Sequence, residues 1–201
     1  MINRTWNGRA GGDSVAIRPV RIYGDPVLTT PAEQVTDFGA QTAQLVDDLI
    51  DTMHDEGGIG MAAPQIGVSA RVFVYDIDGV IGHLINPRLT FPDDELYTGP
   101  EGCLSIPGLR YDTTRYLNVI ADGVDLHGQP QRIIGTGLLA RCIQHETDHL
   151  DGVLFLDRLD EASRVAALAE IAHADWNNDS DAVSITDTVQ LPYLVAARSD
   201  R

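Results

Sequence analysis

The chain has 201 residues, of which 43% are hydrophobic and 22% charged, a composition typical of a globular protein with one domain. Its formal net charge of −16 excludes non-specific binding to nucleic acid or to an anionic membrane, which requires a positive surface. The sequence contains no lysine, so chemistry through a lysine Schiff base is excluded. Residues 1–12 have no apolar stretch typical of a signal peptide, and no apolar run reaches membrane-spanning length. We therefore expect a cytoplasmic protein.

The two ends of the chain differ in composition from its middle. Residues 1–16 are polar and rich in glycine, which predicts a disordered leader. Residues 177–201 form an acidic tail, in which residues 186–195 are either a late edge strand or irregular. Residues 17–176 contain no internal repeat and no linker, and we interpret them as a single domain.

The domain begins with an extended segment, Arg18–Leu28, which ends in a turn at Gly24-Asp25-Pro26. Apolar residues then recur at helical spacing from Asp37 to His54, with acidic residues on the other face, which predicts an amphipathic helix. Residues 57–67 combine glycines with a run of small residues. No Lys-Ser/Thr follows them, so they are not a convincing phosphate loop. They form either a tight turn with close backbone packing or the wall of a ligand groove.

Strands are predicted in hairpins. Residues 71–77 and 80–85 are joined by a turn at Asp78-Gly79, and Asn86-Pro87 ends the second strand. Residues 116–126 and 132–134 flank a turn at His127-Gly128. A later amphipathic helix over residues 161–175 draws its apolar side from Val165, Leu168, Ala169 and Ile171. Hairpins followed by helices predict an α+β fold with an antiparallel sheet.

Residues 145–149 have the pattern H-E-x-x-H. In a helix bounded by Gly137 and Gly152, His145 and His149 share one face and can bind one metal ion, with Glu146 as a candidate base. The alternative is an ordinary helix whose histidines are hydrogen-bonded at a buried edge. A catalytic metal site of this kind also needs a third protein ligand.

The longer metalloprotease pattern does not supply that ligand, because its last position is occupied by Phe155. Glu161 and Glu170 are downstream candidates, as in other H-E-x-x-H peptidases. The better candidate is Cys103, in the upstream segment Glu101-Gly102-Cys103-Leu104-Ser105. The alternative for Cys103 is a disulfide with Cys142, the only other cysteine of the chain.

Three motifs, in this order, resemble those of the peptide deformylases. They are Gly58-x-Gly60-x-Ala62-Ala63-x-Gln65, Glu101-Gly102-Cys103-Leu104-Ser105 and Gln144-His145-Glu146-x-x-His149. The likeness runs from about Arg18 to Leu159, with Met61 standing where leucine is usual, a swap that we expect to have little effect. It implies a deformylase-like catalytic domain over residues 17–176, in which antiparallel sheets pack around a central metal-binding helix and a further helix follows at the C-terminal end.

The resemblance implies a role for each motif residue. Cys103, His145 and His149 are the implied metal ligands, and Glu146 is the implied general acid and base. Gln65 and the backbone N–H of Leu104 are the implied donors to the oxyanion. One divalent ion per chain is implied, with Fe(II) as the native ion and Zn(II) or Ni(II) as substitutes. A thiolate with two imidazoles suits Zn(II) or Fe(II) on chemical grounds as well.

The implied activity is removal of the N-formyl group from the N-terminal methionine of newly made peptides, with release of formate. Three alternatives compete with it. The first is an H-E-x-x-H metallopeptidase with a ligand at Glu161 or Glu170, and the second is a deformylase with another N-formyl substrate. The third is a structural metal site without enzymatic activity, which would have no use for Glu146 and Gln65.

Further residues are assigned to the substrate or to the support of the ligands. Ile59, Gly60, Leu138 and Cys142 are expected at the pocket for the methionine side chain. Arg110 either contacts the peptide backbone at the mouth of the groove or is simply solvated. Glu101 and Arg115 are expected to pair as support for the metal ligands. Asp148 either orients a ligand histidine or caps exposed helix surface; the remaining histidines, His54, His83, His127 and His173, are interpreted as structural or exposed.

The charge of the predicted helix over residues 161–175 indicates which partners it can bind. In some deformylases a basic C-terminal helix docks on the ribosome. Here Asp160, Glu161, Glu170 and Asp175 make the helix acidic, so its attraction to RNA should be weak or reversed. This argues against ribosome association, and we expect neither direct nucleic-acid binding nor a membrane partner.

Overall fold

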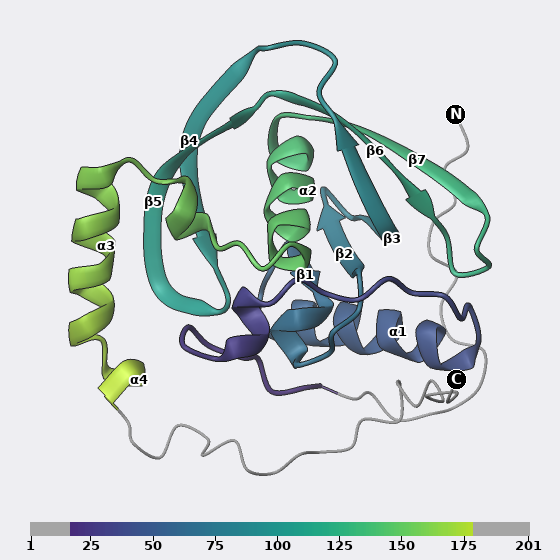
Figure 1. Ribbon diagram of the computed structural model, residues 1–201, viewed down its shortest axis with the longest axis horizontal. Helices are drawn as coiled ribbons and strands as arrows, with labels where there is room; N and C mark the ends of the chain where they lie inside the picture. The colour runs from purple at the N-terminus through teal and green to yellow at the C-terminus, as the bar shows by residue number, and fades with distance from the viewer. Residues whose placement is uncertain (1–16, 179–201) are drawn as a thin grey trace, which may run out of the picture.

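The computed structural model describes residues 17–178 and arranges them around one central helix (Figure 1). This helix, α2 (Gly137–Leu150), lies between two antiparallel sheets. The larger sheet has the strand order β1-β2-β3-β6-β7, and the smaller sheet is the hairpin β4-β5. The α+β fold predicted from the sequence, with antiparallel sheets around a central helix and a helix near the C-terminal end, is confirmed.

The elements have the following bounds. The strands of the larger sheet are β1 (Gly60–Ala62), β2 (Val72–Ile77), β3 (Val80–Thr90), β6 (Asn118–Val124) and β7 (Pro130–Thr136). The hairpin consists of β4 (Leu96–Cys103) and β5 (Ile106–Tyr116). The other helices are α1 (Ala40–Asp55), α3 (Glu161–His173) and α4 (Asp175–Asn178), and three short 3-10 helices are η1 (Pro26–Thr29), η2 (Ala63–Ile66) and η3 (Phe155–Arg158).

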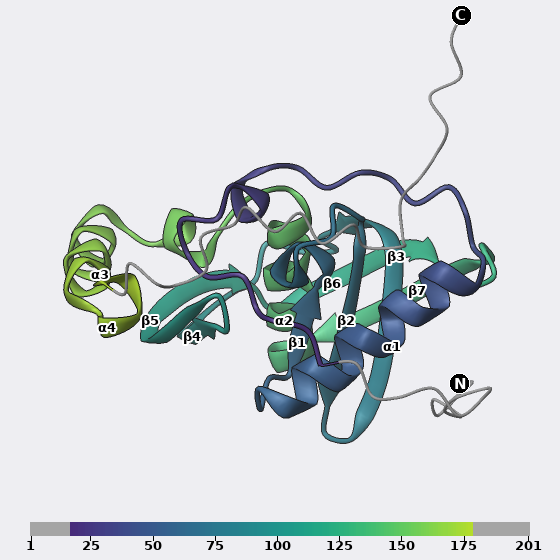
Figure 2. The same cartoon turned by 90° about the horizontal axis from the view of Figure 1, so that it is seen from below.

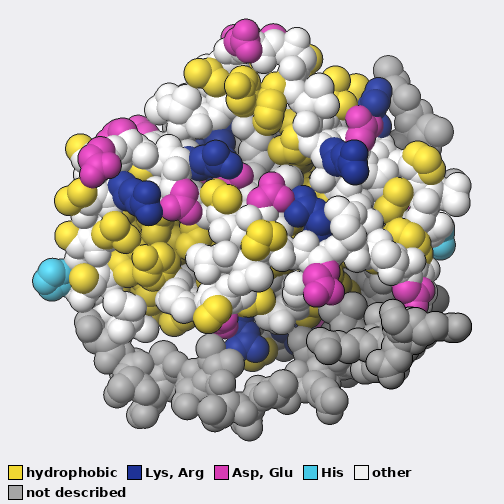
Figure 3. All heavy atoms as spheres, in the orientation of Figure 1, with side chains coloured by type: hydrophobic (Ala, Val, Ile, Leu, Met, Phe, Trp, Pro, Cys, Tyr) yellow, Lys and Arg dark blue, Asp and Glu magenta, His cyan; other side chains and the backbone are white. Residues whose placement is uncertain are grey.

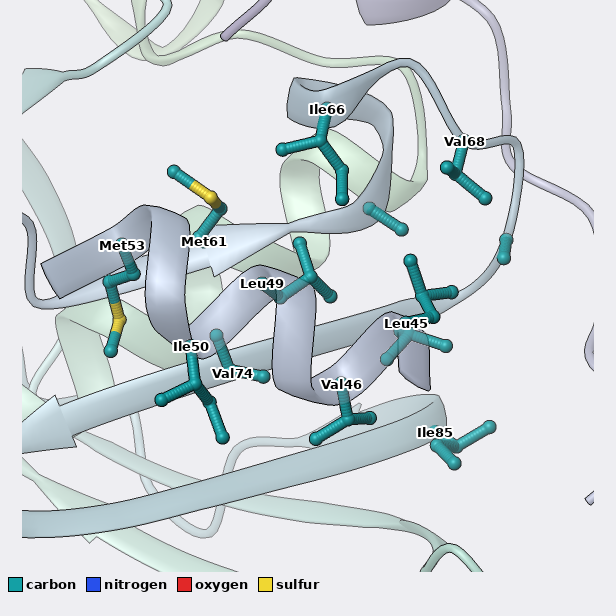
Figure 4. Close-up of a cluster of buried hydrophobic side chains, with 13 residues drawn as sticks. Leu45, Val46, Leu49, Ile50, Met53, Met61, Ile66, Val68, Val74 and Ile85 are labelled. Carbon is teal, nitrogen blue, oxygen red and sulfur yellow. The ribbon is translucent and has the colours of Figure 1, made fainter. Parts of the chain in front are cut away.

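Strand β2 is buried because helices cover both faces of the larger sheet. Successive side chains of a strand point to opposite faces. Val72 and Val74 therefore pack with α1, whereas Phe73 and Tyr75 pack with α2. Figure 4 shows the first of these clusters, in which side chains of α1 such as Leu49 lie against the sheet. The sheet thus fixes α2 on the face opposite α1.

Helix α2 is enclosed along most of its length. Every residue from Ala140 to Leu150 is buried, because the larger sheet covers one side and the hairpin β4-β5 another. The helix ends where the sequence predicts, next to Gly152. This glycine has a φ of +71°, and a Cβ there would lie 2.8 Å from the carbonyl carbon of Thr29, so both the turn and the close approach require glycine.

The hairpin β4-β5 was not predicted from the sequence. Its strands contain Gly99, Pro100, Gly102, Pro107 and Gly108, and these residues conceal the alternation that normally identifies strands. It pairs along its whole length, from Leu96↔Tyr116 to Gly102↔Arg110, with an irregularity before Cys103. Figure 2 shows the hairpin lying between the central helix and α3.

The prediction that Asn86-Pro87 ends a strand was wrong. Strand β3 continues to Thr90, and its pairing with β6 shifts register between Ile85 and Arg88. Asn86 has a φ of +52°, and its side chain bonds the backbone N–H and carbonyl of Val35 at 2.9 and 2.8 Å. The two residues therefore form a bulge, which absorbs the missing N–H of proline without ending the strand.

Helix α3 has a narrower apolar side than the sequence predicts. Ile171 is buried, together with Ala167, and both pack under the hairpin with a third apolar cluster. Val165, Leu168 and Ala169, which were assigned to the same side, are exposed. The prediction was therefore correct for Ile171. It was too broad for the other residues, because the hairpin covers only a narrow strip of α3.

Two of the predicted segments lie outside the described residues. They are the leader over residues 1–16 and, within the tail, residues 179–201 with the possible strand at 186–195. Among residues 17–178, no helix is long and apolar enough to cross a membrane.

Replacing Leu49 with alanine tests the packing of α1 on the sheet. Leu49 is fully buried, so Leu49→Ala should lower the free energy of unfolding by about 2–5 kcal/mol. Urea unfolding measures this change, with Gln41→Ala, at an exposed position of the same helix, as the control. Similar free energies of unfolding for the two variants would contradict the described packing.

Candidate metal centre

Cys103, His145 and His149 come together between the hairpin and the central helix. The two histidines lie one turn apart on α2, with their ring centroids 4.9 Å apart. Cys103 is the last residue of β4, and its Sγ lies 3.2 Å from His149 Nε2. One potential ligand atom from each residue lies within 4.8 Å of the other two. The cluster can therefore hold one metal ion.

The chemistry of these donors fits a transition-metal ion. Burial alone would raise the pKa of the Cys103 thiol, but the nearby imidazoles of His149 and His145 outweigh it and lower the pKa to about 5. The thiolate is the form of cysteine that binds metals. One thiolate and two imidazoles are typical of Zn(II) or Fe(II) sites, and three protein ligands leave a further position for water or substrate.

The other candidates for a third ligand lie elsewhere. Glu161 is exposed in the first turn of α3, and Glu170 accepts a hydrogen bond from the Tyr111 hydroxyl. Neither belongs to the cluster. Cys103 and Cys142 are both free thiols, so the alternative of a disulfide between them is wrong.

Glu101 orients His145 and is itself held by two arginines. Its Oε1 lies 2.7 Å from His145 Nδ1, which leaves Nε2 as the nitrogen available to a metal. Arg115 donates to both carboxylate oxygens, at 3.1 and 2.6 Å, and Arg141 donates to Oε2 at 2.8 Å. Burial would raise the pKa of Glu101, but the hydrogen bonds and charges of His145 and Arg115 together lower it well below its usual range. Glu101 is therefore ionised and accepts all of these hydrogen bonds.

Arg141 joins the central helix to the hairpin. Besides Glu101, it donates to the backbone carbonyl of Thr113 at 2.9 Å and to that of Tyr97 at 3.0 Å. Its guanidinium also lies 5.3 Å from the centroid of the Tyr97 ring, within cation–π range. One buried side chain of α2 thus contacts both strands of the hairpin that carries Cys103.

Asp148 takes neither of the roles that the sequence suggests. It is buried rather than exposed, and its carboxylate binds arginines instead of a ligand histidine. Arg115 Nη1 donates to Oδ2 at 2.6 Å, and Arg158 donates to Oδ2 and Oδ1 at 3.0 and 2.6 Å. Asp148 therefore supports His145 indirectly, by holding the Arg115 that holds Glu101.

The side chain of Gln65 reaches the cluster from η2. Its Oε1 accepts a hydrogen bond from the N–H of Ala62 at 2.9 Å, which fixes the side-chain amide. Its Nε2 points toward Ser105 Oγ, at 3.2 Å, and Cys103 Sγ, at 3.7 Å. An amide donor is thus aimed at the edge of the metal cluster. Leu104, the other residue assigned to the oxyanion, lies between Cys103 and Ser105 in the turn of the hairpin.

Glu146 is buried next to the cluster with one oxygen unsatisfied. Its Oε2 has no hydrogen-bond partner within the described part of the chain. Burial raises its pKa to about 7, although the charges of His145 and His149 act in the opposite direction. A carboxylate with this pKa can both accept and donate a proton near neutral pH.

Gly60 leaves the space that Glu146 occupies. A Cβ at Gly60 would lie 2.4 Å from Glu146 Oε1 and 2.6 Å from Cys142 Sγ. Cys142 is buried, and its Sγ lies 3.6 Å from the carbonyl oxygen of Ile59. The missing side chain therefore lets β1 pass directly over the Glu146 side of the helix. The close backbone packing expected as one alternative for residues 57–67 is thus observed at Gly60, next to Glu146. That these residues form the wall of a ligand groove stays a prediction.

The structure brings some of the residues assigned to the substrate to the cluster. Gly60 and Cys142 lie against Glu146, and Ile59 follows the same edge with 45% of its surface exposed. Leu138 is 52% exposed in the first turn of α2, and Arg110 is exposed on β5. Within residues 17–178, neither of these last two residues makes a hydrogen bond or an ion pair with the cluster.

Arg141, Arg158 and Ser105 were not singled out from the sequence. Arg141 lies four residues before His145, so helical spacing places it on the same side of α2. That spacing could have identified Arg141 as a neighbour of His145. Ser105 belongs to the motif that contains Cys103, but its contact with Gln65 could not be read from that motif because Gln65 is distant in sequence. No local pattern indicates Arg158, because its partner Asp148 belongs to another element.

Comparisons with known proteins agree with this geometry. The model of the polypeptide deformylase family matches residues 17–165. The peptide deformylase of Acidothermus cellulolyticus is 56% identical over 162 residues, which cover 81% of this chain and 89% of that protein. Peptide deformylase 1 of Corynebacterium efficiens is 54% identical over 168 residues, 82% of this chain and 99% of that protein.

Solved structures are similar as well. The peptide deformylase from Thermus thermophilus has a TM-score of 0.74 at 39% identity, over 78% of this chain and 94% of that one. The enzyme from Synechococcus elongatus, in complex with actinonin, has a TM-score of 0.74 at 38% identity, over 81% of this chain and 91% of that one.

The role of Arg141 can be tested by Arg141→Met. Losing its hydrogen bond to Glu101 should loosen His145 and weaken metal binding by about 10–100-fold, the usual effect of removing such support. Competition with a chelator measures the affinity. Arg132→Met, which breaks only an exposed ion pair with Asp122, should leave it unchanged. Equal metal affinity for the two variants would show that Arg141 does not support the site.

Gly60→Ala tests the close approach of β1 to Glu146. Because the new Cβ would overlap the Glu146 carboxylate, that side chain must move. We expect formate release from an N-formyl-Met peptide to fall by at least about tenfold while metal content is retained. Undiminished turnover by this variant would mean that Glu146 need not occupy its described position.

Proposed function

We propose that Cys103, His145, His149 and Glu146 carry the reaction of this chain, which belongs to the peptide deformylase family. The protein is a metal-dependent hydrolase that removes the N-formyl group from the N-terminal methionine of newly made peptides and releases formate. The observation that carries the residue assignment is the buried Glu146 Oε2, which lacks a hydrogen-bond partner in the described chain and belongs to a residue next to the Cys/His/His cluster. A structural metal site would gain nothing from such a group.

Cys103, His145 and His149 would hold one divalent metal ion per chain, with Fe(II) as the native ion and Zn(II) or Ni(II) able to take its place. The thiolate charge of Cys103 and the orientation of His145 by Glu101 support this assignment. When bound, such an ion supplies a Lewis acid that activates water and polarises a carbonyl group.

Glu146 moves the proton. Its carboxylate accepts a proton from the attacking water, whose oxygen bonds to the formyl carbon. When the carbon–nitrogen bond breaks, Glu146 gives that proton to the leaving amine, and the remaining water proton is lost when the formic acid product ionises, so that formate and a free N-terminus are released. A pKa raised by burial to about 7 allows the same side chain to perform both transfers near neutral pH.

Gln65 and the backbone N–H of Leu104 stabilise the negative charge that develops on the formyl oxygen. The Gln65 amide supports this role because its oxygen is held by Ala62 and its nitrogen is directed toward Cys103. Such preorganised donors are worth about 3–4 kcal/mol each in comparable enzymes. Ser105 keeps the amide in place by accepting a hydrogen bond from it.

The substrate binds along the edge formed by Ile59 and Gly60. Ile59, Leu138 and Cys142 offer apolar surface for the methionine side chain, and the first two are accessible from solvent. Arg110, exposed on β5, contacts the peptide backbone at the mouth of the groove. Because the substrate is a newly made peptide, we place the enzyme in the cytoplasm.

Association with the ribosome through the last helix is disfavoured. Asp160 and Glu161 begin α3, and Glu170 and Asp175 follow, so this region carries acidic groups toward any RNA partner. We therefore propose that the enzyme meets its substrate without binding nucleic acid directly, and without a membrane partner.

Glu146→Gln is the variant that tests the assignment. It removes the proton carrier but keeps the size of the side chain, so formate release from N-formyl-Met-Ala-Ser should fall by about 10²–10⁴-fold with metal content unchanged. Glu161→Gln is the control, because it removes an exposed carboxylate of α3 that a metallopeptidase would use as a ligand.

The two variants separate the hypotheses. In our assignment, Glu161→Gln retains both metal and activity. Loss of metal from Glu161→Gln, or peptide-bond cleavage without formate release, would favour the metallopeptidase. Full activity of Glu146→Gln would contradict the proposed proton transfer.

A further inference from the structure

A cavity of about 220 Å³ lies on the far side of the Glu101 network from Cys103. It opens at the end of the hairpin where Leu96 pairs with Tyr116, whereas Cys103 lies at the turn of the same hairpin. Helix α2 contributes Asp148, and η3 contributes Arg158. None of the residues assigned to the metal or to the substrate lines this cavity, so it is separate from the site of deformylation.

The polar side of the cavity carries a net positive charge. It contains the guanidinium groups of Arg115 and Arg158 and one carboxylate, Asp148. Each of the three guanidinium nitrogens of Arg115 already donates to a buried carboxylate, twice to Glu101 and once to Asp148. The formal sum of these three lining charges is therefore +1, in a chain whose net charge is −16.

Arg158 has one guanidinium nitrogen that these contacts do not use. Its Nε and Nη2 donate to Asp148, whereas its Nη1 has no acceptor within the described residues. The side chain is 47% exposed, so the free edge of the guanidinium is accessible. A planar guanidinium edge pairs with a carboxylate through two parallel hydrogen bonds.

The other side of the cavity is apolar and partly aromatic. The rings of Phe91 and Tyr116 stack with their centroids 4.0 Å apart and an interplanar angle of 20°. Leu96, beside them, is 58% exposed, and Phe91 is 38% exposed. Figure 3 shows apolar side chains gathered at the surface near the top of the view, over the connection between β3 and β4. An exposed apolar group next to a free cationic edge is complementary to a ligand with both features.

We propose that this cavity binds a small aromatic carboxylate, with its carboxylate on Arg158 and its ring against Phe91, Leu96 and Tyr116. The volume suits such a molecule, because it is below the roughly 300–1,000 Å³ of pockets for drug-sized ligands and holds the equivalent of about seven waters. The bound ligand would lie next to Arg115 and Asp148, which support Glu101 and through it His145.

Ligand-observed fluorine NMR with 4-fluorophenylacetate tests this proposal on the full-length, metal-loaded protein. We expect saturable binding by the native protein, and binding about tenfold weaker for the neutral 4-fluorophenylacetamide, which lacks the charge that Arg158 recognises. Arg158→Gln should weaken binding of the carboxylate by about the same factor. Arg164→Gln is the matched control, because Arg164 is 49% exposed and also pairs with an aspartate, but does not line the cavity.

A second pair of variants tests the apolar side. Leu96→Asn should weaken binding by about fivefold through loss of apolar contact, whereas Val80→Asn, at a similarly exposed position on β3, should have no effect. The proposal is overturned if the native protein shows no saturable binding up to about 10 mM. It is equally overturned if Arg158→Gln binds the carboxylate as well as Arg164→Gln does, because the probe then binds elsewhere, such as at the metal.

Discussion

The hydrogen bond between Glu101 and His145 connects the two parts of the molecule that the site requires. Glu101 belongs to the hairpin that carries Cys103, and His145 belongs to the helix that carries His149 and Glu146. A buried carboxylate is costly unless it is paired, and here Arg115 and Arg141 pair with it from the two different elements. The hydrogen bonds that stabilise the buried charge of Glu101 therefore also hold the thiolate and the imidazoles close together.

The sequence was sufficient to predict the parts of the fold that depend on local periodicity. Helical spacing from Asp37 to His54 predicted a helix close to the observed α1, and H-E-x-x-H in residues 145–149 lies in the observed α2. Asp78-Gly79 was correctly predicted to join two strands. Helix geometry places His145 and His149 on one face, and the H-E-x-x-H pattern makes Glu146 a candidate base. Cys103 became a candidate because the helix supplies only two ligands. The segment that contains it resembles a motif of the family, and this resemblance implied its role as the third ligand.

Other features depend on contacts that no local pattern encodes. The hairpin β4-β5 is dense in glycine and proline, and its strands are stabilised by long-range pairing and by Arg141 from α2. Asn86-Pro87 usually marks the end of a strand, yet the Asn86 side chain bonds Val35 and turns the pair into a bulge. Asp148 was expected to contact either a histidine or solvent, and its true partners, Arg115 and Arg158, lie on separate elements. In each case a tertiary contact decides the outcome.

X-ray absorption spectroscopy of the zinc-loaded protein tests the central claim most directly, because it reports the donor atoms around the ion. The Cys103, His145 and His149 cluster predicts one sulfur at about 2.3 Å and two imidazole nitrogens at about 2.0–2.1 Å, with a light atom in the remaining position. In Cys103→Ser the sulfur shell should disappear while the two imidazoles remain. A native spectrum without sulfur, or with four protein ligands and no exchangeable position, would contradict the assignment of this cluster as the catalytic metal centre.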